Sequence, residues 1–185
     1  MGNRKLSHAE ISVNRAKPET LHKVEKMPVV VLLDSIRSSY NVGSVFRTSD
    51  GAMIEKLYLC GYTPAPPVKD IMKTALGATE SVVWEFVKDP VEVVKEYKTK
   101  GYTIVALELT DSSVNYTDIS KEIFPLLFII GNEITGVNQA LLDLCDLSVE
   151  IPQYGIKQSL NVAVAYGITI YELRKLFNNN RTNDT

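Results

Sequence analysis

The sequence predicts an α/β protein built on a mostly parallel sheet with helices on both faces. Three observations support this fold class. Short and almost continuously apolar runs, which are typical of buried strands, recur along the chain. Segments with a helical spacing of apolar residues lie between them, and glycine, proline or asparagine marks most of the junctions. Strands and helices that alternate in this way form βα units, whose parallel strands are joined by crossover helices.

The composition is that of a globular protein with one domain. The chain has 185 residues, of which 45% are hydrophobic and 23% are charged. Its net charge of −2 argues against a broadly basic nucleic-acid binder. Residues 1–26 carry six Lys/Arg against three acidic residues, a net of +3, and form a predicted basic extension. The extension either contacts a phosphate backbone or packs on the body as a solvated amphipathic segment.

Several classes of site have no support in the sequence. The two cysteines, Cys60 and Cys145, belong to apolar runs, so neither a disulfide framework nor a metal site is expected. Only His8 and His22 offer imidazole ligands, and both precede the body of the protein. No apolar run approaches the ~20 residues of a membrane span, and the N-terminus lacks the apolar core of a signal peptide. We therefore expect a cytoplasmic protein that binds no metal and no membrane.

The sequence pattern of the first part of the body predicts three strands. Val29 begins the first buried strand, and the prolines at 64, 66 and 67 mark residues 62–67 as a loop. The predicted elements are a strand over 29–33, a helix over 41–51, a strand over 57–60, a short helix over 69–76 and a strand over 82–87.

The second part continues the alternation. Asp89-Pro90 opens a helix that Gly101 closes. The other predicted elements are strands over 102–107, 126–130 and 147–151, turns in the polar stretch 110–120, and a helix over 137–145. Ser159 is the predicted N-cap of a last helix that ends at Phe177. Its predicted core face consists of Leu160, Val164, Ile168, Tyr171 and Leu173, and a disordered polar tail over 178–185 follows the domain at 27–177.

Three loops follow predicted strands, and ligands of open α/β sheets bind at the carboxyl ends of strands. They are the N-x-G-x-x-x-R pattern over Asn41–Arg47, the loop over Gly131–Gly136, and the stretch over Ile151–Ala163, in which Gly155, Ser159 and Asn161 crowd a strand-to-helix turn. Such a turn offers backbone donors and acceptors to a small molecule.

The spacing of Gly131 and Gly136 is that of a phosphate-binding P-loop, but the chemistry differs. Val137 and Asn138 occupy the positions that require a lysine and a hydroxyl residue, and Glu133 would repel a triphosphate. The dinucleotide pattern G-x-G-x-x-G is absent as well. These features exclude an NTPase and remove the main support for an NAD-type enzyme.

Taken together, the three motifs resemble the SpoU (TrmH-like) family of the SPOUT superfamily of RNA 2′-O-ribose methyltransferases. The residues that carry the resemblance are Asn41, Gly43, Arg47, Gly131, Asn132, Glu133, Gly136, Ile151, Pro152, Gly155, Ser159, Leu160 and Asn161. The segments 73–78 and 102–105 also look like family segments, and the similarity covers about residues 28–177. The branch that acts on guanosine in tRNA is the most similar.

The resemblance implies a fold that periodicity alone does not predict. A parallel α/β sheet would have its C-terminal segment threaded through a loop as a deep trefoil knot, although chain connections are otherwise unknotted. It also implies a homodimer and an S-adenosylmethionine site in the knot. The implied cofactor residues are Leu107, Gly131, Ile151, Ser159 and Leu160.

For catalysis the resemblance implies Arg47, with Asn41 as its positioning partner and Glu133, Ser159 and Asn161 shaping the site. Because the arginine pKa exceeds ~12, we expect Arg47 to act as a fixed cation rather than as a base. Each residue also has a simpler interpretation, since Asn41 suits a helix cap, Arg47 a solvated charge and Glu133 a loop anion. Further candidate RNA contacts are Arg37, Lys73 and Lys157.

The predicted function is S-adenosylmethionine-dependent methylation of a ribose 2′-hydroxyl in RNA, with tRNA favoured over rRNA. Two alternatives stay open at this stage: a non-catalytic SPOUT module that only binds RNA, and methylation of a base atom. Arg47 in its N-x-G-x-x-x-R setting favours ribose methylation by family analogy.

Overall fold

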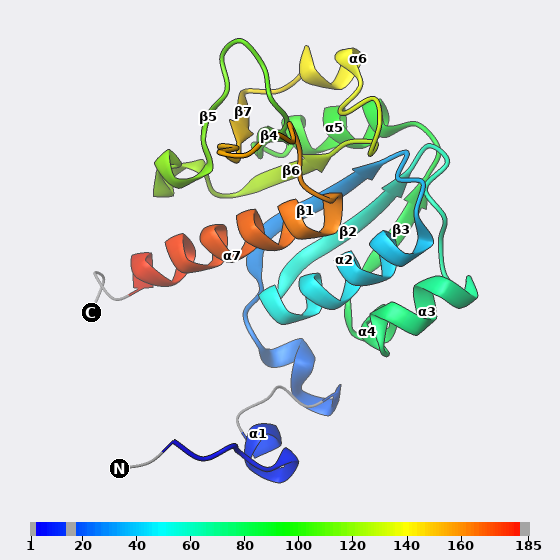
Figure 1. The fold of residues 1–185 in the computed structure, drawn as a ribbon, viewed down its shortest axis with the longest axis vertical. Coiled ribbons are helices and arrows are strands. Elements are labelled where there is room, and N and C mark those ends of the chain that lie inside the picture. The colour runs from blue at the N-terminus through cyan, green and yellow to red at the C-terminus, as the bar shows by residue number, and fades with distance from the viewer. Residues whose placement is uncertain (1–2, 14–17, 182–185) are drawn as a thin grey trace.

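A seven-stranded parallel sheet forms the centre of the molecule (Figure 1). The computed structural model describes residues 3–13 and 18–181. Within them the strand order is β3-β2-β1-β6-β4-β7-β5, and every pairing is parallel. The strands are β1 (Met27–Asp34), β2 (Ile54–Cys60), β3 (Trp84–Val87), β4 (Thr103–Leu107), β5 (Val114–Asn115), β6 (Leu126–Ile130) and β7 (Leu147–Glu150). The predicted parallel α/β fold is confirmed.

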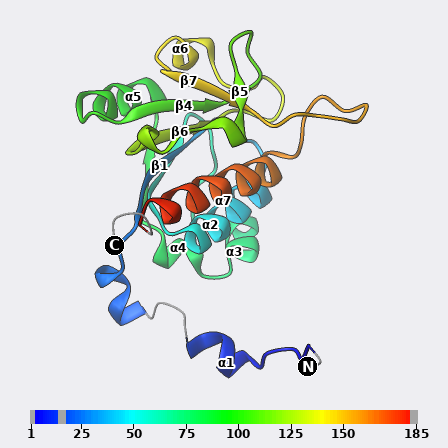
Figure 2. The same cartoon turned by 90° about the vertical axis from the view of Figure 1, so that its left-hand side faces the viewer.

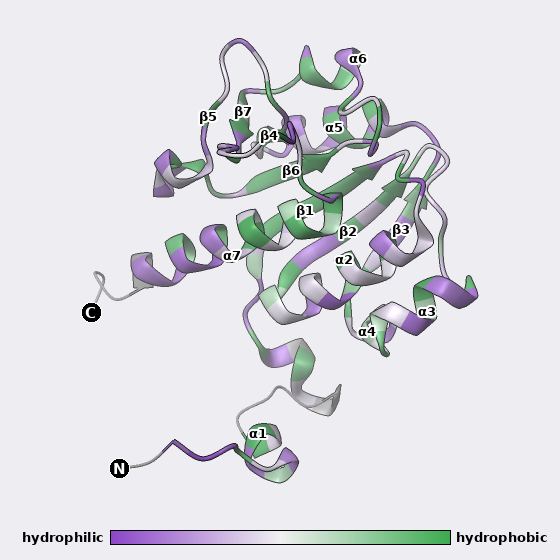
Figure 3. Ribbon diagram, viewed as in Figure 1, coloured by the Kyte–Doolittle hydropathy of each residue, from purple (hydrophilic) through white to green (hydrophobic). Residues whose placement is uncertain are grey.

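Helices cover both faces of the sheet because the side chains of successive strand residues point to opposite faces. In β1, Val29 and Val31 belong to one buried cluster and Val30 and Leu32 to another. The first cluster includes residues of α2 (Ser39–Ala52), α3 (Lys69–Ala75), α4 (Ala78–Ser81) and α7 (Val162–Arg181). The second includes residues of α5 (Pro90–Thr99) and α6 (Gln139–Leu142). Figure 3 shows the hydrophobic residues concentrated along the central strands β1 and β6.

Most predicted elements are present, with shifted ends. Asp89 caps α5 by accepting a hydrogen bond from Val91 N, as the Asp-Pro pair predicts. Helix α2 starts before Asn41, because the Ser38 side chain accepts the N–H of Asn41 and acts as the N-cap. The interpretation of Asn41 as a helix cap is therefore wrong, and its amide is available for other contacts.

Two predictions for the second part of the chain were inaccurate. The stretch over 110–120 contains β5, a two-residue strand that pairs with β7 at the edge of the sheet. So short a strand has no periodicity of its own and exists only through its partner. The helix predicted over 137–145 is limited to Gln139–Leu142, because the Asn138 side chain caps it at Ala140 N and the chain turns again before β7.

The last helix differs most from its prediction. It begins at Val162 rather than at Ser159, and it continues to Arg181, beyond the predicted domain end at Phe177. Residues 178–181 are thus helical, not disordered. Four of the five predicted core residues are 36–52% exposed, namely Leu160, Val164, Ile168 and Tyr171, and only Leu173 is buried. Tyr166 and Ile170 face the core instead. The trefoil knot stays a prediction.

Two short helices precede the sheet, α1 (His8–Val13) and the 3-10 helix η1 (Pro18–Lys23). Figure 2 shows α1 lying away from the sheet and its covering helices. Of the predicted basic extension, Arg4 pairs with Glu10, whereas Arg15 and Lys17 lie outside the described residues. The predicted domain boundaries stay predictions, and so does the character of residues 182–185.

Candidate functional site

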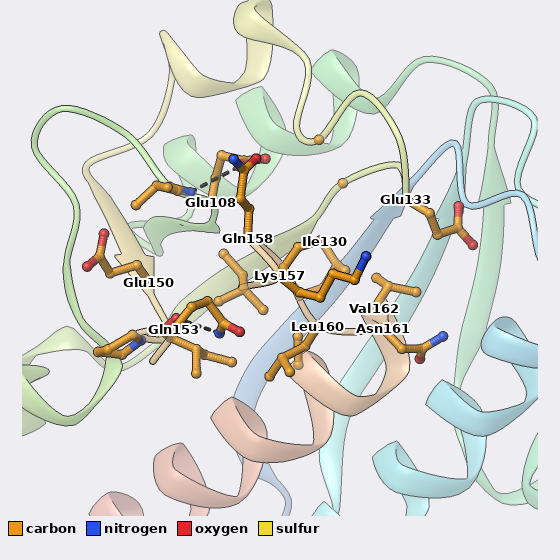
Figure 4. Close-up of a pocket in the computed structure, with 18 of the residues that line it drawn as sticks. Glu108, Ile130, Glu133, Glu150, Gln153, Lys157, Gln158, Leu160, Asn161 and Val162 are labelled. Carbon is orange, nitrogen blue, oxygen red and sulfur yellow. Dashed lines mark hydrogen bonds between the residues drawn. The ribbon is translucent and has the colours of Figure 1, made fainter. Parts of the chain in front are cut away.

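A pocket of about 660 Å³ lies at the carboxyl ends of β4, β6 and β7 (Figure 4). All the predicted cofactor residues line it: Leu107, Gly131, Ile151, Ser159 and Leu160. Three of the predicted catalytic residues also line it: Glu133, Ser159 and Asn161. The structure thus brings together residues from three strand ends that are far apart in the sequence. Their individual roles stay predictions.

A tight turn after β6 forms one wall of the pocket. Asn132 and Gly136 exchange both backbone hydrogen bonds, at 3.0 and 2.9 Å. A Cβ on Gly131 would lie 2.3 Å from the Gly136 carbonyl carbon, and Gly136 has a φ of +69°. The two glycines are therefore required by the turn itself, which accounts for their P-loop spacing without any phosphate.

The Glu133 carboxylate holds the turn between β1 and α2. Its oxygens accept the N–H of Arg37 at 2.8 Å, the N–H of Ser38 at 3.1 Å and the side-chain amide of Asn41 at 2.9 Å. Burial raises the pKa of Glu133, but the hydrogen bonds, of which that from Arg37 is the strongest, outweigh it and leave the pKa below its ordinary value. Glu133 is a positioning group held in its charged form.

Asn161 connects the predicted cofactor-binding stretch over Ile151–Ala163 to the hydrogen bonds of Glu133. Its side-chain oxygen accepts the N–H of Ala163 at 3.0 Å, so Asn161, not Ser159, is the N-cap of α7. Its amide nitrogen donates to the Asn41 side-chain oxygen at 3.1 Å. A continuous chain of hydrogen bonds therefore runs from Asn161 through Asn41 to Glu133, and it joins all three sequence motifs.

Arg47 lies apart from this chain. It is on α2, is exposed, and makes no hydrogen bond or ion pair with any described residue. It precedes Gly51 by one helical turn and so lies on the same side of α2. A Cβ on Gly51 would be 2.7 Å from the Tyr171 hydroxyl, so this side of α2 borders α7. Arg47 therefore lies on the side of α2 that borders α7, and its guanidinium has no ion-pair partner among the described residues.

Two acidic residues of the pocket were not singled out from the sequence. Glu108 follows β4, and its carboxylate accepts the N–H groups of Val137 at 2.8 Å and Leu109 at 3.0 Å. Glu150 ends β7 and accepts the Ser113 hydroxyl at 2.5 Å. Figure 4 shows both at the pocket. Each lies at the carboxyl end of a strand, so the strand-end rule applied to every strand would have found them.

The three candidate RNA contacts are all exposed. Lys157 lines the pocket, and Arg37 lies in the turn that Glu133 holds. Lys73, on α3, has its Nζ 5.9 Å from the centroid of the Tyr40 ring. The structure is compatible with these contacts and does not test them.

Within residues 3–13 and 18–181, no group of three or more His, Cys, Asp or Glu side chains is arranged to hold a metal ion. No helix in the same part of the chain is long and apolar enough to cross a membrane.

The chain is similar in sequence to known RNA methyltransferases. The chain matches the SpoU rRNA Methylase family over residues 28–171. A tRNA (guanosine(18)-2′-O)-methyltransferase of Aquifex aeolicus is 33% identical over 159 residues, which cover 85% of this chain and 73% of that enzyme.

Solved structures give the same result. A TrmH/SpoU tRNA modifying enzyme of A. aeolicus has a TM-score of 0.78 at 31% identity, over 88% of this chain and 81% of that one. An AdoMet-bound rRNA methyltransferase from Sinorhizobium meliloti has a TM-score of 0.76 at 28% identity, over 87% of this chain. This chain spans 61% of the Sinorhizobium enzyme, and 59% of a Staphylococcus haemolyticus relative assigned to the TrmH family. The protein belongs to the SpoU methylase family.

Proposed function

We propose that the protein is an S-adenosylmethionine-dependent methyltransferase that modifies a ribose 2′-hydroxyl in RNA, with tRNA favoured over rRNA. The observation that carries this proposal is the hydrogen-bond chain from Asn161 through Asn41 to Glu133, at the mouth of a pocket that all the predicted cofactor residues line. The Aquifex relative acts on guanosine 18 of tRNA, which supports tRNA as the substrate class.

The pocket suits S-adenosylmethionine, which supplies an electrophilic methyl group when it is bound. Leu107, Ile151 and Leu160 offer apolar contacts to an adenine ring. Among the described residues, the N–H groups of Gln153 and of residues 155–160, which line the pocket, make no backbone hydrogen bond and are available to the polar atoms of a cofactor. The AdoMet-bound structure of the Sinorhizobium relative supports the same assignment.

Positioning supplies much of the proposed catalysis, because transfer requires the 2′-oxygen in line with the methyl group. Glu133 and Asn161 hold Asn41, and Asn41 orients the substrate beside the pocket. Arg47 grips an RNA phosphate and stabilises the negative charge that develops on the 2′-oxygen. A guanidinium side chain suits a fixed cation with a planar fork of donors and not a general base.

We infer that the protein is a homodimer that associates through α7. Val164, Ile168 and Tyr171 form an apolar stripe at helical spacing, and they are 52%, 36% and 52% exposed. We call these three residues the α7 stripe. On the same helix a Cβ on Gly167 would meet no atom within 4 Å, so another helix can approach closely there. A second copy on the α7 stripe would lie next to Arg47. A knotted passage of residues 151–161 belongs to this proposal as well, as does a cytoplasmic location, where tRNA is found.

The decisive experiment is transfer of labelled methyl from S-adenosylmethionine to separated, unmodified tRNA and rRNA, followed by nucleoside analysis. Label in a 2′-O-methylnucleoside of tRNA is the expected result. Label in rRNA alone would show that the substrate is rRNA and not tRNA. Label on a base would show that the enzyme methylates a base atom and not the ribose. Cofactor binding without any transfer would favour the non-catalytic RNA-binding module.

A further inference from the structure

A second pocket of about 440 Å³ lies beside the first, at the carboxyl ends of β1 and β6. These strands are neighbours, but the helices that follow them pack on opposite faces of the sheet, α2 in one buried cluster and α6 in the other. Such a divergence is a topological switch point, where open α/β sheets bind ligands. Asn132 and Gly136 line both pockets, so the two pockets adjoin at the Gly131–Gly136 turn.

A buried carboxylate in the second pocket has unused hydrogen-bonding capacity. Asp34 ends β1 and is only 6% exposed. The Ser35 hydroxyl, at 3.0 Å, is its one hydrogen-bond donor among the residues that the structure describes, and none of their cations pairs with it. An ionised carboxylate has about four acceptor positions, so those that Ser35 leaves open are available to a donor that enters the pocket. The geometry favours a ligand that brings N–H donors.

An aromatic ring stands at the same pocket. Tyr62 is 63% exposed, and its hydroxyl accepts a hydrogen bond from the Asn132 side-chain amide at 2.6 Å. The same amide nitrogen also donates to the Ser35 carbonyl at 2.7 Å. The ring is thereby fixed at its tip while its faces are accessible, an arrangement that stacks nucleobases. The remaining lining is neutral: Ser35, Thr135, Gly136, Val137, Asn138 and Gln139 join Asn132.

Asp34 is the only charged residue among those that line this pocket, so an anion such as phosphate would be repelled. Of the four RNA bases, guanine presents two adjacent donors, N1–H and N2–H, which match the two oxygens of a carboxylate. Adenine, cytosine and uracil each place an acceptor next to their donor on this edge. A buried carboxylate therefore favours guanine by charge and by geometry.

We propose that the second pocket binds the guanine base of the nucleotide to be methylated, with Asp34 accepting N1–H and N2–H and Tyr62 stacking on the ring. This inference rests on the proposed RNA methyl transfer. The pocket volume lies within the range of about 300–1,000 Å³ of small-molecule sites. With the base in the second pocket, the ribose would cross the Gly131–Gly136 turn toward the first.

The test measures binding of mononucleotides by NMR, with ¹⁵N-labelled protein and without methyl transfer. Guanosine, inosine and adenosine 5′-monophosphates are titrated separately, since inosine keeps N1–H and lacks the 2-amino group. We expect guanosine monophosphate to shift the amide signals of Ser35, Tyr62 and residues 132–139, and to bind at least about tenfold more tightly than the other two. Asp34→Asn, which preserves the shape and the contact with Ser35, should abolish this preference. Asp111→Asn, in an exposed loop, should retain it.

Equal binding of the three nucleotides, a preference that survives in Asp34→Asn, or shifts confined to the first pocket would overturn the inference. If Asp34→Asn does not fold, Tyr62→Leu provides the second measurement. It should weaken binding of all three nucleotides and keep their order, and unchanged affinity would count against the pocket. An enzyme that methylates RNA and shows no guanine preference would refute this pocket alone and leave the proposed function intact.

Discussion

At the level of single residues, Glu133 is the acceptor on which the turn after β1 depends. It takes two backbone N–H groups and the amide of Asn41, so its charge holds a loop that would otherwise have unsatisfied donors. The role of Glu133 in shaping the catalytic site stays a prediction, and these contacts give the geometry on which it would rest. Its sequence position alone could not distinguish this from a solvated loop anion, because the donors come from residues nearly a hundred positions earlier.

The pKa of Glu133 gives a prediction for stability against pH. Because hydrogen bonds hold this pKa below its ordinary value of 4.5, the carboxylate stabilises the fold above that pH, and the contribution is lost as the pH falls through the lowered value. Glu133→Gln should therefore be less stable than the wild type at pH 7, and the difference should shrink below about pH 4. Urea unfolding at several pH values measures this. Glu80→Gln, at an exposed position, should show no such dependence, and a difference independent of pH would refute the assignment.

Arg47 gives a prediction for catalysis. Lysine in its place retains the charge and loses the fork that grips a phosphate, so Arg47→Lys should lower the rate of methyl transfer at least about tenfold, and Arg47→Ala about a hundredfold or more. Affinity for S-adenosylmethionine, measured by calorimetry, should be unchanged, because Arg47 does not line the first pocket. Near wild-type turnover in Arg47→Lys would count against the bidentate grip.

At the level of elements, the residue that caps α7, Asn161, makes two different contacts. Asn161 caps the helix and also donates to Asn41, which lies 120 positions earlier in the sequence. Asparagine does both because its side chain carries an acceptor and a donor. Serine at position 159 was an equally good cap by residue type, and only the path of the chain out of the pocket moved the cap to Asn161.

These two contacts can be separated by substitution. Asn161→Ala should lower the free energy of unfolding by about 1 kcal/mol through loss of the cap. Asn161→Asp should restore most of that stability, since aspartate caps helices well, but it cannot donate to Asn41. We therefore expect low methyl-transfer activity in both variants. Recovery of activity together with stability in Asn161→Asp would show that the link to Asn41 is dispensable.

At the level of the whole molecule, the exposed apolar residues of the α7 stripe favour burial against a second protein surface. Ile168→Glu should convert a dimer into a monomer, which sedimentation or light scattering would detect, and methyl transfer should fall with it because Arg47 lies beside this surface. Val83→Glu is a matched control, as Val83 is 51% exposed and lies next to β3, off the stripe. A wild-type protein that is monomeric at assay concentrations would refute the dimer.

The sequence by itself determined the strand and helix alternation and the parallel sheet, because buried strands leave local patterns. Its resemblance to the SpoU family, and not a local pattern, implied the cofactor residues that line the first pocket, and Glu108 and Glu150 were missed. Only the tertiary structure decided which face of α7 is buried, since both faces carry apolar residues. It also decided that β5 exists, that Asn161 is the cap, and that Asp34 and Tyr62 share a pocket. Each of these depends on contacts between residues distant in the chain, and such contacts leave no period or spacing in a single sequence.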